Sequence, residues 1–139
     1  EWLEQVRPTV THMTPAMGQL LCMAAPDGHT LPLRAIFFGG DRLLPELTAK
    51  LSKLAPQATL VNFYGATETP QAAAFHVVDP DAHWATHPIG RGIDNMQLRI
   101  VDAAREPAPE GVPGEIAVAT PFLSLGYVKG GAIEPHARP

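Results

Sequence analysis

The chain has 139 residues, of which 45% are hydrophobic and 17% charged, and its formal net charge is −4. This length and apolar content suit one folded domain and exclude a disordered chain. The weak negative charge, without a basic run, argues against nucleic acid or an anionic membrane as a partner, and no apolar run approaches the roughly 18 residues of a membrane span. The single cysteine, Cys22, excludes an intrachain disulfide and is consistent with a cytoplasmic location.

Short apolar runs alternate with helical patterns over the first half of the chain, which is typical of β-α-β units and a mainly parallel sheet. The run at residues 33–38 is largely apolar, and we expect both faces of this strand to be covered. The predicted strands are residues 9–13, 33–38 and 58–63.

Two helices are predicted between these strands. The first begins after Thr14, a hydroxyl N-cap that is followed by Pro15 at the first helical position. Apolar residues surround this helix, so we expect it to be mostly buried and Cys22 to serve in packing, not as a nucleophile. The second helix begins at Pro45 and carries one apolar face, made of Leu47, Leu51 and Leu54.

The pattern changes after Gly65. Thr67 is predicted to cap a short helix with Pro70 in its first turn, where the missing N–H costs little. A further strand is predicted at residues 74–78, before the turn residues Asp79 to Asp81.

Two later runs, residues 97–101 and 115–118, alternate polar and apolar side chains and flank a loop rich in proline and glycine. Such runs suit an antiparallel or barrel-like sheet with one wet face. We therefore divide the chain into an α/β subdomain over residues 1–80 and the start of a β-rich subdomain over residues 81–139.

Residues 62–69 combine the end of a strand, a glycine turn and polar side chains, and ligands of open α/β sheets bind at the carboxyl ends of strands. Tyr64 offers a flat face on which a base can stack. Thr67 offers a hydroxyl and helix-start N–H groups for phosphate oxygens, and Glu68 a hard oxygen ligand for Mg²⁺. The alternative is a capped helix after a glycine turn, with Tyr64 in the core.

Two weaker signals stand beside this one. The glycines in the loop at residues 38–42 let a ligand approach the backbone, although a plain strand-to-helix turn explains them as well. His83 and His87 have metal-ligand spacing, but Pro88 disfavours a helix there, and we expect an exposed loop. His12, taken alone, is typical of a core histidine.

Residues 62–69 resemble the N-x-Y-G-P-T-E motif of adenylate-forming enzymes, specifically the adenylation domains of nonribosomal peptide synthetases, with Ala66 at the usual proline. Residues 114–127 resemble a later motif, G-E-L-x-[IV]…[AS]-x-G-Y, and residues 88–102 are similar to the P-I-G…V-x-[VI]-[VL]-D stretch between them. Residues 10–21 look like the branch that joins adenylation to a carrier domain and a reductase domain, including the fungal α-aminoadipate reductases.

This resemblance implies a flavodoxin-like βαβαβ subdomain followed by part of a β-barrel-like subdomain, with ATP and Mg²⁺ as cofactors. It implies that Tyr64 stacks on adenine, Thr67 contacts the α-phosphate and Glu68 holds Mg²⁺. The implied nucleotide site comprises Gly40, Asp41, Arg42, Asn62, Tyr64, Gly65 and Thr67. The implied acyl pocket comprises His12, Phe37, Gly39, Phe63, Gln71 and Ala72.

The residue type at position 71, a glutamine, is informative about the charge of the substrate. The α-aminoadipate enzymes carry an arginine at this position, which can pair with the second carboxylate of their substrate. Because Gln71 is uncharged, the resemblance does not extend to α-aminoadipate, and Phe37 and Phe63 favour an acid with an apolar or neutral portion.

The implied reaction is activation of a carboxylic or amino acid as an acyl-adenylate, followed by transfer to the phosphopantetheine thiol of a carrier-protein domain. The family's phosphate loop, its ribose-binding aspartate and its bridging lysine are missing from this sequence, and the chain begins at Glu1, not Met. We therefore expect a piece of a longer enzyme that is inactive alone. The alternative is a non-catalytic module: an excised specificity subdomain, or a small α/β nucleotide-binding or interaction domain.

Overall fold

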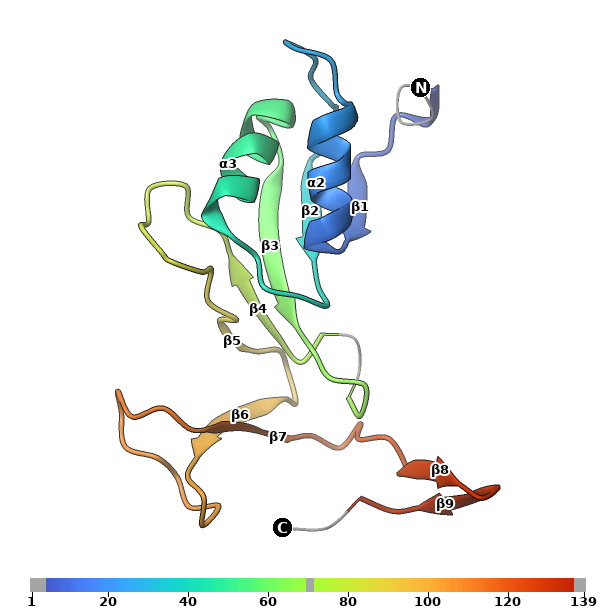
Figure 1. Ribbon diagram of the computed structural model, residues 1–139, viewed down its shortest axis with the longest axis vertical. Helices are drawn as coiled ribbons and strands as arrows, with labels where there is room; N and C mark the ends of the chain where they lie inside the picture. The colour runs from blue at the N-terminus through green and yellow to red at the C-terminus, as the bar shows by residue number, and fades with distance from the viewer. Residues whose placement is uncertain (1–4, 70–71, 137–139) are drawn as a thin grey trace.

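The computed structural model describes residues 5–69 and 72–136 and contains, in these residues, a five-stranded sheet in the order β1-β2-β3-β4-β5 (Figure 1). The first three strands are parallel, and β4 and β5 are antiparallel to their neighbours. The strands are β1 (Val10–Met13), β2 (Ala35–Phe38), β3 (Thr59–Tyr64), β4 (Ala74–Val77) and β5 (Arg91–Gly92). The strand–helix–strand–helix–strand prediction is confirmed.

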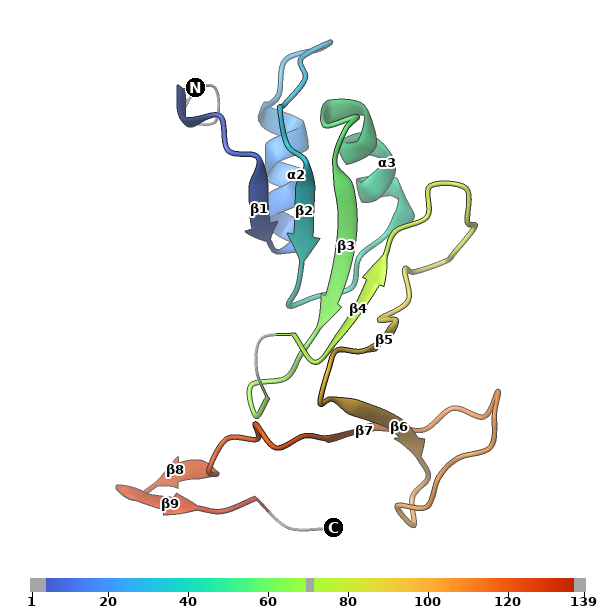
Figure 2. The same cartoon turned by 180° about the vertical axis from the view of Figure 1, so that it is seen from behind.

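Two helices, α2 (Pro15–Ala24) and α3 (Pro45–Leu54), connect the parallel strands and lie on the same face of the sheet (Figures 1 and 2). The hydroxyl of Thr14 accepts a hydrogen bond of 3.3 Å from the backbone N–H of Met17, which confirms the predicted N-cap. The apolar face predicted for α3 is buried, as expected of an amphipathic helix that covers a sheet.

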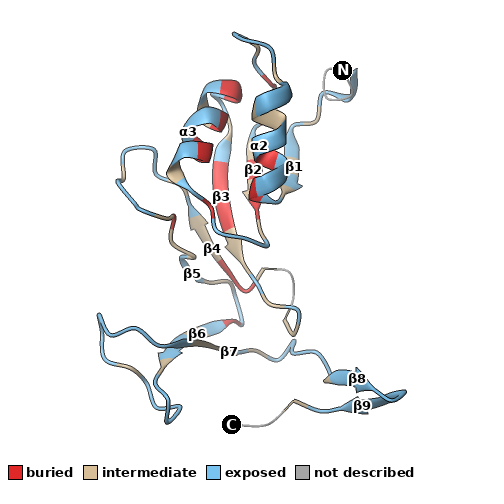
Figure 3. Cartoon of the chain, viewed as in Figure 1, coloured by how far each residue is buried: buried red, intermediate tan, exposed pale blue. Residues whose placement is uncertain are grey.

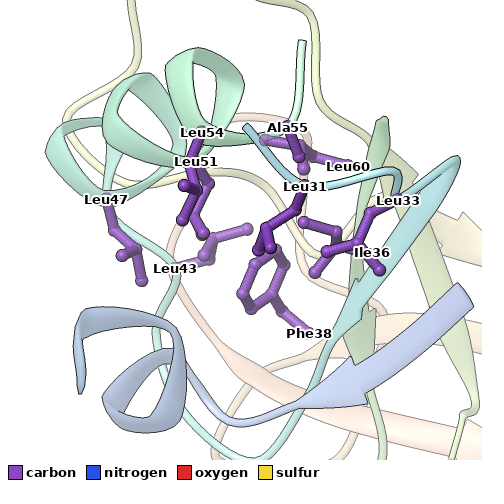
Figure 4. Packing of buried hydrophobic residues seen from close by; sticks show 10 residues of the cluster. All are labelled: Leu31, Leu33, Ile36, Phe38, Leu43, Leu47, Leu51, Leu54, Ala55 and Leu60. Carbon is purple, nitrogen blue, oxygen red and sulfur yellow. The ribbon is translucent and has the colours of Figure 1, made fainter. Parts of the chain in front are cut away.

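The hydrophobic core lies between this face of the sheet and the helices, mainly under α3 (Figure 4). Ile36 and Phe38 of β2 have no exposed surface and meet Leu51 of α3, which is equally buried. The labelled core residues are Leu31, Leu33, Ile36, Phe38, Leu43, Leu47, Leu51, Leu54, Ala55 and Leu60.

The prediction that α2 is mostly buried is wrong. Leu20 is 64% exposed and Met23 81%, and Cys22 is only half-buried. Much of the α2 ribbon is coloured as exposed in Figure 3. The helix packs through Gly18, where an added Cβ would lie 3.2 Å from the ring of Phe38. No other segment of the described residues covers the apolar outer side of this helix. Helical periodicity shows which residues share a face of a helix, but it does not show whether another element covers that face.

The prediction that β2 is covered on both faces is also wrong. Side chains alternate along a strand, so Ile36 and Phe38 face the helices while Ala35 and Phe37 face the opposite side and are only partly buried. No helix of the described residues lies on that side (Figure 2). An apolar run therefore marks a strand here without showing how many of its faces are covered.

Residues 67–69, where the short helix predicted after Thr67 would begin, form a turn, and the described residues around them contain no helix. The Thr69 hydroxyl closes this turn by accepting from the backbone N–H of Ala66 at 3.2 Å and donating to the Ala66 carbonyl at 3.1 Å. Thr67 therefore has no helix-start N–H groups beside it in the described residues, and Pro70 and Gln71 lie outside those residues.

The remaining strands form two antiparallel pairs beyond the carboxyl ends of the parallel strands (Figures 1 and 2). The first pair confirms the alternating runs predicted there, and the second, a hairpin around two glycines, was not predicted. Residues 5–69 and 72–136 contain no closed barrel and no helix with the length and apolar character of a membrane crossing. The strands are β6 (Gln97–Val101), β7 (Glu115–Ala119), β8 (Tyr127–Lys129) and β9 (Ala132–Glu134).

Candidate functional site

A cleft of about 430 Å³ lies at the carboxyl ends of β2 and β3. Since Phe38 and Asn62 are paired in register, the loops that follow the two strands leave the sheet at the same edge. The cleft brings together six of the seven residues predicted for nucleotide binding, and Thr67 is not among its lining residues. The lining residues are Gly40, Asp41, Arg42, Asn62, Phe63, Tyr64, Gly65, Thr86, His87 and Ile89.

The loop after β2 forms one wall of the cleft through Gly40, Asp41 and Arg42. Gly40 has a φ of 90°, a left-handed conformation that glycine adopts at little cost. The carboxylate of Asp41 accepts a hydrogen bond of 2.7 Å from the backbone N–H of Arg42. Both residues are exposed and line the cleft.

Asn62 joins β3 to the opposite wall. Its side-chain amide donates to the carbonyl of Pro88 at 2.9 Å and to that of His87 at 3.5 Å, and the residue is 4% exposed. Its Oδ1 is buried without a hydrogen-bond partner in the described residues. Sequence reasoning missed this wall, although the motif at residues 88–90 marks its position.

His87 is 4% exposed, so the expectation of an exposed loop is wrong at this residue, although His83 is exposed. Its Nε2 lies 2.9 Å from the hydroxyl of Thr48, which donates its own proton to the Pro45 carbonyl at 3.0 Å. In the neutral tautomer that carries its proton on Nε2, His87 donates this hydrogen bond to Thr48. Burial, together with the nearby His76, lowers the pKa of His87, which favours the neutral ring.

An aromatic wall lies on the open face of the sheet, and it consists of four residues predicted for the acyl pocket. Phe37 and Phe63 stack with ring centroids 5.0 Å apart and planes at 14°, and His12 meets Phe63 edge-on at 6.1 Å. A Cβ added to Gly39 would lie 3.2 Å from His12 Nε2, so glycine permits this close packing. His12 is exposed and is not a core histidine.

Two other residues, Gln71 and Ala72, are predicted for the acyl pocket. Ala72 is half-buried and lies two residues before β4. Gln71 falls outside the described residues.

Glu68 lies in the turn after β3 and is held by the segment that leads into β8. The backbone N–H of Ser124 donates to the Glu68 carbonyl at 2.8 Å, and the phenol of Tyr127 donates to Oε1. This phenol hydrogen bond lowers the pKa of the Glu68 carboxyl and raises the pKa of Tyr127. The carboxylate of Glu68 is therefore charged at neutral pH. Thr67 is exposed in the same turn.

The oxygen ligands near Glu68 determine whether this turn could bind Mg²⁺. The described residues contain no group of three His, Cys, Asp or Glu side chains that could enclose a metal ion. Mg²⁺ in nucleotide sites is bound by one or two carboxylates together with phosphate oxygens and water. Glu68 comes three residues after Gly65, which lines the cleft. Its single carboxylate fits an ion that is shared with nucleotide phosphates, and it does not fit a metal centre held by the protein alone.

The fold and the site define an α/β protein whose candidate ligand site lies at the carboxyl edge of its parallel strands. Residues 1–128 match the family model of the AMP-binding enzymes. The chain belongs to this family.

Two kinds of relative illustrate the match. The chain is 35% identical over 138 residues to an L-2-aminoadipate reductase of Schizosaccharomyces pombe, covering 92% of this chain and 10% of the relative. It is 33% identical over 119 residues to tyrocidine synthase 3 of Brevibacillus parabrevis, covering 86% of this chain and 2% of that protein. The chain thus spans a tenth or less of the length of these two relatives.

Solved structures agree with this assignment. The AMPPNP-bound form of the nonribosomal peptide synthetase FmoA3 superposes with a TM-score of 0.83 and 32% identity, covering 92% of this chain and 14% of that one. The Vibrio cholerae adenylation domain AlmE, in complex with glycyl-adenosine-5'-phosphate, superposes with a TM-score of 0.80 and 31% identity, covering 91% and 25%. The mixed α/β architecture is therefore that of part of an adenylation domain.

Proposed function

We propose that the chain is part of an ATP-dependent adenylation domain that activates a carboxylic or amino acid and transfers it to the phosphopantetheine thiol of a carrier-protein domain. The observation that carries the proposal is the cleft, which gathers six residues predicted for nucleotide binding, in a chain of the AMP-binding family. The aromatic wall provides an apolar surface for the acid.

The cleft would receive the adenine end of ATP. Tyr64 offers a ring for stacking, and the loop from Gly40 to Arg42 offers main chain at close range. Asn62 lines the cleft as a buried residue and would hold its far wall through the Pro88 carbonyl. The Thr67 hydroxyl, in the turn after the cleft, would contact the α-phosphate.

In the proposed reaction the acid's carboxylate attacks the α-phosphorus, the bond to the β-phosphate oxygen breaks and pyrophosphate leaves. The carrier thiol then loses its proton and attacks the acyl carbonyl, the acyl C–O bond of the mixed anhydride breaks, and AMP leaves with the electron pair of that bond. This chain's residues bind and orient the two reactants, which removes much of the entropic barrier. Glu68 would hold Mg²⁺, which supplies neutralisation of phosphate charge when bound.

The acyl pocket would use the aromatic wall together with Gln71 and Ala72. Its members carry no formal charge when His12 is neutral, so we propose a neutral or partly apolar acid and not α-aminoadipate. We also propose the division into residues 1–80 and 81–139, and a cytoplasmic site of action, which the single cysteine favours.

The test is ATP–pyrophosphate exchange by the full-length protein with a panel of acids. We expect exchange with at least one neutral acid and a loss of about 100-fold or more in Glu68→Gln, whereas Glu110→Gln, an exposed loop glutamate, retains wild-type exchange. Absence of exchange with every acid, or full activity of Glu68→Gln, would refute the proposal in favour of a non-catalytic module. Exchange by the 139-residue chain alone would refute the expectation that it is inactive by itself.

A further inference from the structure

The segment at the start of β8 forms two hydrogen bonds with Glu68, the residue proposed to hold Mg²⁺. Tyr127 and Glu68 are 59 residues apart in sequence, yet the Tyr127 phenol donates to the Glu68 carboxylate. Three residues before Tyr127, the backbone N–H of Ser124 donates to the Glu68 carbonyl at 2.8 Å. Two contacts, one to the main chain and one to the side chain, therefore join the same residue to the same segment.

The direction of the Tyr127 side chain is set by the hairpin in which it lies. Tyr127 is paired with Glu134 at the open end of β8 and β9. Gly126 precedes it with a φ of 144°, and an added Cβ would lie 2.0 Å from the Glu134 carbonyl oxygen, so only glycine allows the second strand to pass this close.

A third side chain packs against the phenol from the end of the hairpin. The ring of His136 meets the Tyr127 ring edge-on with centroids 5.1 Å apart. His136 Nε2 lies 2.7 Å from the Ser124 hydroxyl. His136 therefore contacts both Tyr127 and Ser124, the two residues that hydrogen-bond to Glu68. The phenol is thus oriented before any ligand binds.

We infer that Tyr127 is a positioning residue, whose hydroxyl holds one oxygen of the Glu68 carboxylate and thereby aims the other at the cation that accompanies the nucleotide phosphates. The inference rests on the proposed function. A carboxylate has lone pairs enough for both partners. Glu68 is only half-buried, and a glutamate in such a turn otherwise samples several rotamers. A hydrogen bond that selects one rotamer lowers the entropy lost when the cation binds.

The experiment compares Tyr127→Phe with wild type in the full-length protein, because this change removes the hydroxyl and keeps the ring. Mn²⁺ binding is titrated by EPR in the presence of a non-hydrolysable ATP analogue, so that no turnover is needed. We expect the Mn²⁺ dissociation constant to rise about three- to tenfold, and the Mg²⁺ concentration for half-maximal exchange to rise in parallel, with the KM for the acid unchanged.

Two further variants separate the possible causes. Lys129→Met breaks the 3.5 Å ion pair with Glu134 in the same hairpin without touching Glu68, and we expect wild-type Mn²⁺ binding. If Glu68→Gln binds Mn²⁺ normally, the proposed role of Glu68 fails. If Glu68→Gln weakens binding while Tyr127→Phe binds as tightly as wild type, or more tightly, the positioning role of Tyr127 alone is overturned.

Discussion

The side-chain amide of Asn62 donates a hydrogen bond of 2.9 Å to the carbonyl of Pro88, 26 residues further along the chain. This bond joins the end of β3 to the segment that forms the far wall of the cleft. The position of this wall therefore depends in part on a buried amide, beside the contact of His87 with Thr48.

Replacing this amide tests the dependence directly. In Asn62→Ala the carbonyls of His87 and Pro88 lose their donor, and we expect the KM for ATP to rise about tenfold, corresponding to roughly 1.4 kcal/mol for the lost hydrogen bonds. Asn95→Gly, a change in a loop residue with a φ of 66°, is the matched control and retains the wild-type KM. Equal KM values for Asn62→Ala and wild type in pyrophosphate exchange would show that Asn62 does not shape the nucleotide site.

Phe63 is the centre of the aromatic wall, since it contacts both Phe37 and His12. Phe63→Ala opens space on that wall, and we expect the preferred acid in the exchange assay to shift to a larger one, with kcat/KM for the original acid reduced about tenfold or more. Phe122→Ala removes an exposed ring elsewhere and leaves the preference unchanged. An unaltered ranking of acids in Phe63→Ala contradicts the assignment of this wall to the acyl group.

Burial of His87 predicts a dependence of stability on pH. Its pKa is lowered in the folded chain from the ordinary 6.5, so the unfolded chain binds the proton more readily. The stabilising contribution is therefore complete above pH 6.5 and declines as the pH falls below it. We expect the free energy of unfolding, measured with urea, to decrease from about pH 7.5 to about pH 5.

The substitution His87→Gln isolates this effect, because the glutamine amide can still donate to Thr48 but does not titrate. We expect a smaller decrease in stability between about pH 7.5 and about pH 5 than in wild type. His83→Gln, at an exposed position, leaves the wild-type decrease in place. Parallel pH profiles for wild type and His87→Gln would rule out His87 as the source.

The position of the core predicts that alanine substitutions of two leucines on neighbouring helices change the free energy of unfolding by very different amounts. Leu51 of α3 has no exposed surface, and Leu51→Ala is expected to lower the free energy of unfolding by about 2–5 kcal/mol. Leu20 of α2 is 64% exposed, and Leu20→Ala changes it by less than about 0.5 kcal/mol. Chemical denaturation of both variants measures the difference, and a loss of the same size in Leu20→Ala would mean that α2 is covered after all.

Much of the fold follows from local sequence signals. The order of strands and helices up to β4 depends on apolar runs of strand length, on prolines and on the Thr14 cap, and each of these acts within a few residues. The boundary proposed at residue 80 stays a prediction. Arg91 and Gly92 of β5 still pair with β4, however, so the first sheet continues past that point.

Sequence patterns were enough for the α/β order, the family motifs and the six cleft residues on the loops after β2 and β3, because neighbouring parallel strands bring their carboxyl ends to one edge. The folded chain was needed to show which face of β2 is covered and that the outer side of α2 is exposed. The contacts of Asn62 with Pro88 and of Tyr127 with Glu68 were also seen only in the folded chain. They join segments that are distant in the sequence, and neither periodicity nor motifs predict which distant residues will meet.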